Sequence, residues 1–77
     1  MADTQERVTQ LLVRQFNISE GEVNPETSFL DLTDSFGIAE FAAAVETEFQ
    51  CSIREDEEAY AIENVGQLVS YLDARSG

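Results

Sequence analysis

Histidine and tryptophan are absent from this sequence of 77 residues, and cysteine, methionine and proline each occur once. Without histidine the chain lacks the usual general base, the commonest metal ligand and the group that activates serine or cysteine nucleophiles. A single thiol, Cys51, excludes an internal disulfide and a cysteine zinc site. A chain this short buries only about 60% of the surface that its unfolded form exposes. These shortages predict one small domain, residues 1–77, that is not an independent enzyme.

Basic residues are also scarce, because four arginines oppose 16 acidic residues and the formal net charge is −12. Nucleic-acid binding needs clusters of lysine and arginine, and these arginines are scattered, so we expect no nucleic-acid partner. The acidity favours partner proteins with basic surfaces. The longest apolar run, residues 41–45, is too short to span a membrane, and the first residues are polar. We therefore expect a monomeric, cytoplasmic protein without a membrane span or a secretory leader.

Apolar residues at helical spacing predict a small all-α bundle of three main helices and one short helix. The first helix is expected over residues 3–17, the second over 34–49, and the last after its cap, Asn64. A short helical turn is expected over residues 55–60, with Ile53 and Ile62 as the anchors on its two sides. The expected buried positions of the main helices are Val8, Leu11, Leu12, Phe16, Phe41, Val45, Phe49, Val65, Leu68, Val69 and Leu72.

The connection between the first two helices, residues 18–33, is unusually long for so small a domain and contains the only proline. Apolar residues are spaced through it, so we expect a loop that is anchored on the core. The expected anchors are Ile18, Val23, Phe29, Leu30 and Leu32.

The acidic residues do not form a recognisable metal site. A calcium-binding loop needs glycine at its sixth position and glutamate at its twelfth. A loop that opens at Asp31 has Phe36 and Ala42 there, and the register that places Gly37 sixth fails as well. The acidic run over residues 55–58 is typical of a solvated face. We therefore expect neither a metal site nor paired-carboxylate catalysis.

Ser35 is the candidate functional residue. It follows Asp34 at the end of the long connection and opens a predicted helix, whose N-terminus attracts anions such as phosphate. No histidine or lysine is present to activate its hydroxyl. The local pattern leaves two interpretations open: a serine that caps a helix, and a hydroxyl to which another enzyme attaches a phosphodiester.

The residues around Ser35 resemble the acyl carrier protein family, in which an Asp-Ser-Leu-like motif opens the second helix. Here the motif is Asp-Ser-Phe-Gly, over residues 34–37. Upstream, Thr-Ser-Phe-Leu-Asp-Leu (27–32) is similar to the end of the family's first loop, and the similarity extends over about residues 8–72. The resemblance implies the family's fold, with a long first loop.

The same resemblance implies that Ser35 carries a covalent 4′-phosphopantetheine arm, which a phosphopantetheinyl transferase attaches from coenzyme A. The thiol of the arm, rather than Cys51, then holds an acyl or aminoacyl group as a thioester for loading and acceptor enzymes. Phe36 lies off the apolar stripe of its helix, so we expect it to be partly exposed. The implied contacts with basic surfaces of partner enzymes are Asp34, Phe36, Glu40, Glu46 and Glu48.

Several features separate the chain from typical fatty-acid carriers. Gly37 stands where those carriers usually have an acid, the loop before Asp34 is shorter, and residues 42–44 are all alanine. The Asp-Ser-Phe-Gly version is more similar to D-alanyl and some peptidyl carrier proteins. We therefore expect a specialised pathway rather than housekeeping fatty-acid synthesis. The alternative is an unmodified acidic helical adaptor that binds partners without an arm.

Overall fold

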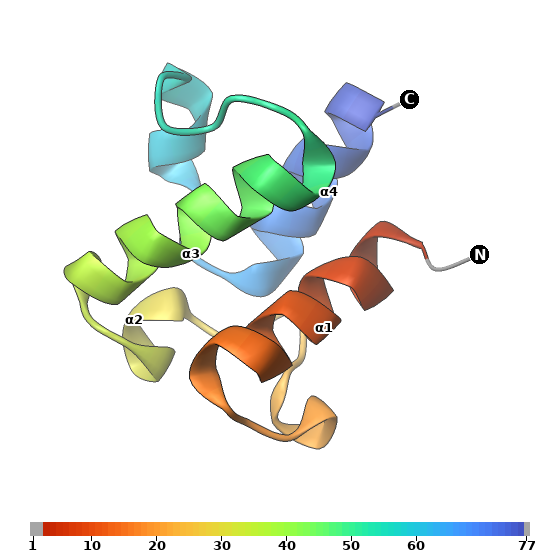
Figure 1. Ribbon diagram of the computed structural model, residues 1–77, viewed down its shortest axis with the longest axis vertical. Helices are drawn as coiled ribbons and strands as arrows, with labels where there is room; N and C mark the ends of the chain where they lie inside the picture. The colour runs from red at the N-terminus through yellow and green to blue at the C-terminus, as the bar shows by residue number, and fades with distance from the viewer. Residues whose placement is uncertain (1–2, 77) are drawn as a thin grey trace.

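Helix α1 (Thr4–Phe16) packs against both α3 (Ser35–Phe49) and α4 (Val65–Ser76). Figure 1 shows these three helices in a computed structural model, which describes residues 3–76. Within those residues an isolated bridge is the only β-pairing and no strand forms. The predicted all-α fold and its three main helices are therefore confirmed.

Side-chain caps determine where the helices begin. Before α1, Oδ1 of Asp3 accepts a hydrogen bond from the backbone N–H of Glu6 at 2.8 Å. Before α4, Oδ1 of Asn64 accepts from the N–H of Gln67 at 2.9 Å, and Oε1 of Gln67 accepts from the N–H of Asn64 at 3.1 Å. This reciprocal pair is a capping box, which satisfies N–H groups that the first helical turn leaves without partners. Both caps were predictable from residue type and spacing.

The core is organised around Phe41 of α3. Its ring centroid lies 5.6 Å from that of Phe16 in α1 and 5.7 Å from that of Phe29 in the connection. Aromatic pairs at such distances contribute about 0.5–1.5 kcal/mol beyond the area that they bury. The three rings therefore join α1, α3 and the connection. The largest completely buried side chains around them are Val8, Leu12, Val45, Val65 and Leu72.

The connection over residues 18–33 contains two short helices that the sequence did not predict: η1 (Glu20–Glu22), a 3-10 helix, and α2 (Phe29–Leu32). Phe29 is buried, as expected of an anchor. Leu30 is 70% exposed, so the prediction that it anchors the loop is wrong. The reason is helical geometry: residues three apart share a face, so Phe29 and Leu32 turn inward and the residue after Phe29 turns outward.

The connection is also bonded to the start of α4. The N–H of Phe29 donates to the carbonyl of Glu63 at 3.1 Å, and the N–H of Gly66 donates to the carbonyl of Pro25 at 2.9 Å. A Cβ atom on residue 66 would lie 3.0 Å from that carbonyl oxygen, so glycine permits this close approach. These bonds hold the residues that precede Ser35 in a defined position.

The turn predicted over residues 55–60 is a 3-10 helix, η2 (Glu57–Ala61). Ile53 on one side of it is buried, and Ile62 on the other side packs partly against the core. Both were predicted as anchors and are confirmed. Because η2 contains no fully buried side chain, polar contacts contribute to its attachment.

Gly37 provides a test of the junction between the connection and α3. Glycine to alanine in a helix usually stabilises by up to about 1 kcal/mol. A Cβ at residue 37 would instead overlap the hydroxyl of Thr33 and lie 3.0 Å from its Cβ. We expect Gly37→Ala to lower the free energy of unfolding by about 1–3 kcal/mol in urea titrations.

Gly21→Ala is the matched control, because a Cβ there meets no atom within 4 Å. It should change stability by less than about 0.5 kcal/mol. Adding Thr33→Ala to Gly37→Ala should recover part of the loss. A Gly37→Ala protein as stable as the wild type would contradict the proposed overlap.

Candidate functional site

Ser35 is the first residue of α3 and is exposed. Figure 1 shows this end of α3 beside α2, on the side of the bundle away from both chain ends. The capping residue is Asp34, whose Oδ1 accepts from the N–H of Gly37 at 2.9 Å. Among the described residues no side-chain hydrogen bond involves the Ser35 hydroxyl. Asp34 therefore takes the capping role that Ser35 would otherwise fill, and leaves the hydroxyl accessible.

The start of α3 suits a phosphate ester on Ser35. The N–H of Gly37 donates to the side chain of Asp34, and the N–H of Ile38 donates to the Asp34 carbonyl at 3.0 Å. The N–H groups of Ser35 and Phe36 precede these and have no intrahelical acceptor. Together with the helix dipole they provide partial positive charge next to the hydroxyl, which favours an attached anion.

Two of the predicted partner contacts lie close to Ser35 on the exposed side of α3. Phe36 is 74% exposed, in agreement with the predicted exposure. Glu40, just over one turn further along the helix, is exposed as well. The structure therefore brings Asp34, Ser35, Phe36 and Glu40 together at the N-terminal half of α3.

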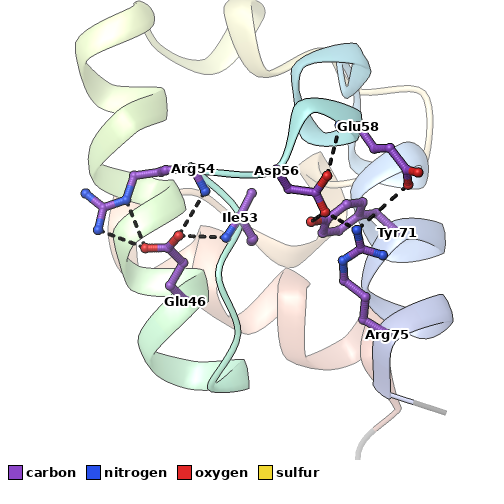
Figure 2. A network of polar contacts seen from close by, with 7 residues as sticks. All are labelled: Glu46, Ile53, Arg54, Asp56, Glu58, Tyr71 and Arg75. Carbon is purple, nitrogen blue, oxygen red and sulfur yellow. Dashed lines mark hydrogen bonds and ion pairs between the residues drawn. The ribbon is translucent and has the colours of Figure 1, made fainter.

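Glu46 does not join this group. Its Oε2 accepts from the backbone N–H groups of Ile53 and Arg54 at 2.7 and 2.9 Å, and its Oε1 accepts from Nε of Arg54 at 2.9 Å (Figure 2). The hydrogen bonds from the backbone N–H groups of Arg54 and Ile53 lower the pKa of Glu46, and that from Arg54 has the largest effect. Only 15% of its side chain is exposed, so Glu46 presents little of its carboxylate as the partner contact that the sequence suggested. The reason is that the segment after α3 folds back across the last turns of the helix.

Glu48 lies at the contact between α3 and α1. Its carboxylate is 3.6 Å from the guanidinium of Arg7 and 4.0 Å from that of Arg14. Arg7 also donates to the backbone carbonyl of Glu48 at 3.0 Å and lies over the ring of Phe49. The carboxylate of Glu48 is thus used between helices, apart from the group at Ser35.

A second polar cluster, which sequence reasoning missed, attaches η2 to α4. Oδ2 of Asp56 accepts a hydrogen bond from the hydroxyl of Tyr71 at 2.6 Å and pairs with Arg75 (Figure 2). The hydrogen bonds from Tyr71 and Arg75 lower the pKa of Asp56 to about 2, and that from Tyr71 has the largest effect. The partners are 15 and 19 residues away in sequence, so no local spacing indicates the cluster.

An apolar cavity of about 90 Å³ lies in the core behind α3. Ala42, one of the three consecutive alanines, contributes to its lining together with Phe41, Val45 and Ile62. A methyl side chain at residue 42 leaves space in this cavity that a larger apolar side chain would fill. This cavity is below the roughly 150 Å³ of a dry engineered cavity that accommodates benzene.

Residues 6–72 match the protein-family model described as "Phosphopantetheine attachment site". Because the match covers more than half of the chain, this protein belongs to that family, as the resemblance to acyl carrier proteins implies. It is a phosphopantetheine carrier, and the prosthetic group of its class is covalently attached 4′-phosphopantetheine. Such carriers are typically not catalytic and work with phosphopantetheinyl transferases and partner enzymes.

Two further findings concern residues 3–76. None of the helices there has the length and apolar character that crossing a membrane requires. No group of three or more histidine, cysteine, aspartate and glutamate residues in this part of the chain is arranged to hold a metal ion.

The Asp56 cluster predicts a specific pH dependence. The pKa of Asp56 is about 2 in the folded protein, below its usual 3.8, so ionised Asp56 stabilises the fold. This stabilisation is complete above pH 3.8 and is lost as the pH falls towards 2.

We expect Asp56→Asn to be less stable than the wild type at neutral pH and to lose less stability between pH 3.8 and 2, as measured by thermal melts. Asp73→Asn, exposed on α4, should follow the wild-type profile; a parallel shift of the Asp56→Asn profile at all pH values would contradict the assignment.

Glu46 and Glu40 can be compared as a matched pair on one helix. Glu46→Gln removes an ionised acceptor from three N–H groups, so its denaturation midpoint in urea should fall clearly below that of the wild type. Glu40→Gln should leave the midpoint unchanged. Equal midpoints for the two variants would show that the Glu46 bonds do not stabilise the fold.

Proposed function

We propose that Ser35 is the attachment residue of the 4′-phosphopantetheine arm, and that the chain delivers an acyl or aminoacyl group, held on the arm as a thioester, to partner enzymes. The observation that carries the proposal is the exposed Ser35 hydroxyl at the first position of α3, within the region matched by the family. Asp34 supports it, because its carboxylate caps the helix in place of the serine.

Attachment requires one substitution at phosphorus. The Ser35 oxygen forms a bond to the phosphorus of coenzyme A that bears the pantetheine, and the nucleotide portion of coenzyme A leaves. The serine proton goes to a base of the transferase, since this chain has no histidine or lysine to accept it. Asp34 holds the first turn of α3, and the free N–H groups there compensate the negative charge of the ester.

The bound arm supplies a flexible tether with a terminal thiol, which raises the local concentration of the cargo at each partner active site. Cys51 is not suited to that role. Its thiol is half-buried, and burial, with a smaller contribution from the charge of Glu46, raises its pKa. Cys51 is therefore mostly protonated at neutral pH and is a poor nucleophile.

Partner enzymes with basic surfaces are proposed to contact Asp34, Phe36 and Glu40. Glu46 and Glu48 were expected to contribute as well, but their carboxylates are occupied by Arg54, Arg7 and Arg14. A cation of a partner enzyme would have to compete with these ion pairs to contact Glu46 or Glu48. The Asp-Ser-Phe-Gly motif supports a specialised pathway, and a monomer in the cytoplasm is consistent with this role.

The test is the intact mass of the protein after incubation with coenzyme A, magnesium and a broad-specificity phosphopantetheinyl transferase. The wild type should gain the mass of one arm, and Ser35→Ala should gain none. Ser52→Ala, which removes another exposed serine hydroxyl, should gain one arm as the wild type does. No gain by the wild type with several transferases would reject the proposal and leave the unmodified acidic adaptor as the better interpretation.

A further inference from the structure

We propose that a groove between the start of α1 and α4 is a second docking surface, which binds a cationic protein segment that carries one apolar side chain. This α1–α4 groove has a volume of about 240 Å³ and is lined by Gln5, Pro25, Val65, Gly66, Val69 and Ser70. None of these residues belongs to α2 or α3. The inference goes beyond the proposed function, because it concerns a surface that attachment at Ser35 does not use.

Apolar side chains that the fold leaves partly uncovered line the α1–α4 groove. Val65 is only 1% exposed and forms its base, and Pro25 is exposed at its edge. Val69 is half-buried, although its spacing on α4 is that of a core position. The apolar stripe of α4 therefore continues beyond the surface that the rest of the chain covers. The groove is larger than the roughly 150 Å³ of a cavity that accommodates benzene, so it has space for one apolar side chain.

An acidic hollow adjoins the groove. It is lined by Asp3, Gln5, Glu6, Thr9, Glu20 and Val23, so that Gln5 lines both depressions. The dipole of α1 favours acidic side chains at its start, which accounts for Asp3 and Glu6. It does not account for Glu20, which belongs to η1 and reaches the hollow because η1 packs against α1. Three carboxylates from two segments thus meet next to the apolar groove.

The charge of the acidic hollow is not compensated by the chain itself. Within residues 3–76 no ion pair involves a carboxylate of the hollow. Glu20 accepts a hydrogen bond from the side-chain amide of Gln10, which is neutral. Arg7 follows Glu6 in the sequence, but its guanidinium pairs with Glu48 of α3. The other three arginines also pair with carboxylates outside the hollow.

This charge determines which occupant the groove accepts. A second copy of the chain also has a net charge of −12, and its arginines are engaged in the same ion pairs, so two copies repel each other. A nucleic acid or an anionic lipid surface is repelled for the same reason. A protein segment with lysine or arginine beside one apolar side chain matches both depressions. Its apolar side chain fills the groove, and its cations face the hollow.

The α1–α4 groove lies apart from Ser35. Helix α1 starts on the side of the bundle that holds both chain ends, and α3 starts on the side away from them (Figure 1). A protein bound at the groove therefore leaves the start of α3 exposed. One partner can hold the carrier while another acts on Ser35 or its arm.

Binding is measured by titrating the isotope-labelled apo-protein with a short synthetic peptide that has lysines on both sides of one leucine. In NMR spectra the backbone N–H signals of Gln5, Gly66 and Ser70 should shift most, and those of Ser35 and Phe36 should stay in place. A peptide with alanine instead of leucine should bind at least about fivefold more weakly, because it buries less apolar surface.

A substitution that fills the groove tests the apolar contact. Ser70 is exposed on α4 and lines the groove, so Ser70→Phe should raise the Kd of the leucine peptide at least about fivefold. Ser52→Phe is the matched control, because it adds the same ring at an exposed serine outside the groove. It should keep the wild-type Kd. Thermal melts establish that both variants are folded.

Two double variants test the contribution of charge. Glu6→Gln with Glu20→Gln, and Glu55→Gln with Glu57→Gln, each change the net charge from −12 to −10. The first should raise Kd about three- to tenfold at low salt, and the difference should disappear at about 0.5 M salt. The second, at exposed residues outside the hollow, should stay within about twofold of the wild type.

The independence of the two surfaces is tested by arm transfer from coenzyme A in the presence of saturating peptide. The initial rate should remain within about twofold of the rate without peptide. A blocked transfer would show that the peptide covers Ser35 and would overturn the proposal. Because the titrations use the apo-protein, failure of arm attachment would reject the proposed function and leave the groove as a docking surface.

Three further results would overturn the proposal. Equal Kd values for the two double variants would show that the peptide responds only to net charge. Shifts confined to the N–H groups of α3 would place the peptide beside Ser35. A dimer of the free protein that forms with rising concentration, with shifts at Gln5, Gly66 and Ser70, would assign the groove to a second copy.

Discussion

The packing of Phe41 against Phe16 and Phe29 is the contact on which the arrangement of this protein depends. Phe41 belongs to α3, Phe16 to α1 and Phe29 to the connection that ends at Ser35, so one cluster of rings positions all three. Truncation of such a ring in a core typically costs about 3–5 kcal/mol, which is a large part of the stability of a small domain. Because Phe29 is held inward, Leu30 is held outward, where it lines a groove together with Ile38 and Tyr60.

Scarcity of cations is the second constraint. The chain has four arginines, and each of them pairs with a carboxylate of another segment. Arg7 and Arg14 connect α1 with α3, Arg54 connects the segment after α3 with that helix, and Arg75 connects α4 with Asp56, which precedes η2. The carboxylates that they engage are Glu46, Glu48, Asp56 and Glu58, and a partner cation would compete there with an arginine of the chain itself. The acidic residues around Ser35, namely Asp31, Asp34 and Glu40, are exposed and take part in no ion pair among the described residues. One set of acidic side chains thus pairs with arginine within the fold, and another, around Ser35, is left exposed.

Much of the fold was predictable from local signals. Helical spacing indicated α1, α3 and α4, and the capping residues Asp3 and Asn64 indicated two of their starts. The position of Ser35 at the beginning of a helix was predictable for the same reason. The environment of Glu46 was not predictable, since its residue type and spacing are those of a solvent-facing glutamate. Its partial burial depends on a later segment, at Ile53 and Arg54. Helix α2 escaped prediction because four residues are too few to show a periodic pattern.

The sequence by itself determined the helices, the absence of any activating group for Ser35, and the Asp-Ser motif that identifies the carrier family. These depend on residue type and on contacts between positions three or four apart, which the order of residues specifies directly. Only the tertiary structure decided which carboxylates are occupied, because their partners are up to 41 residues away, as with Arg7 and Glu48. It also decided that Leu30 and Tyr60 line one groove together, since that depends on how the connections before and after α3 fold.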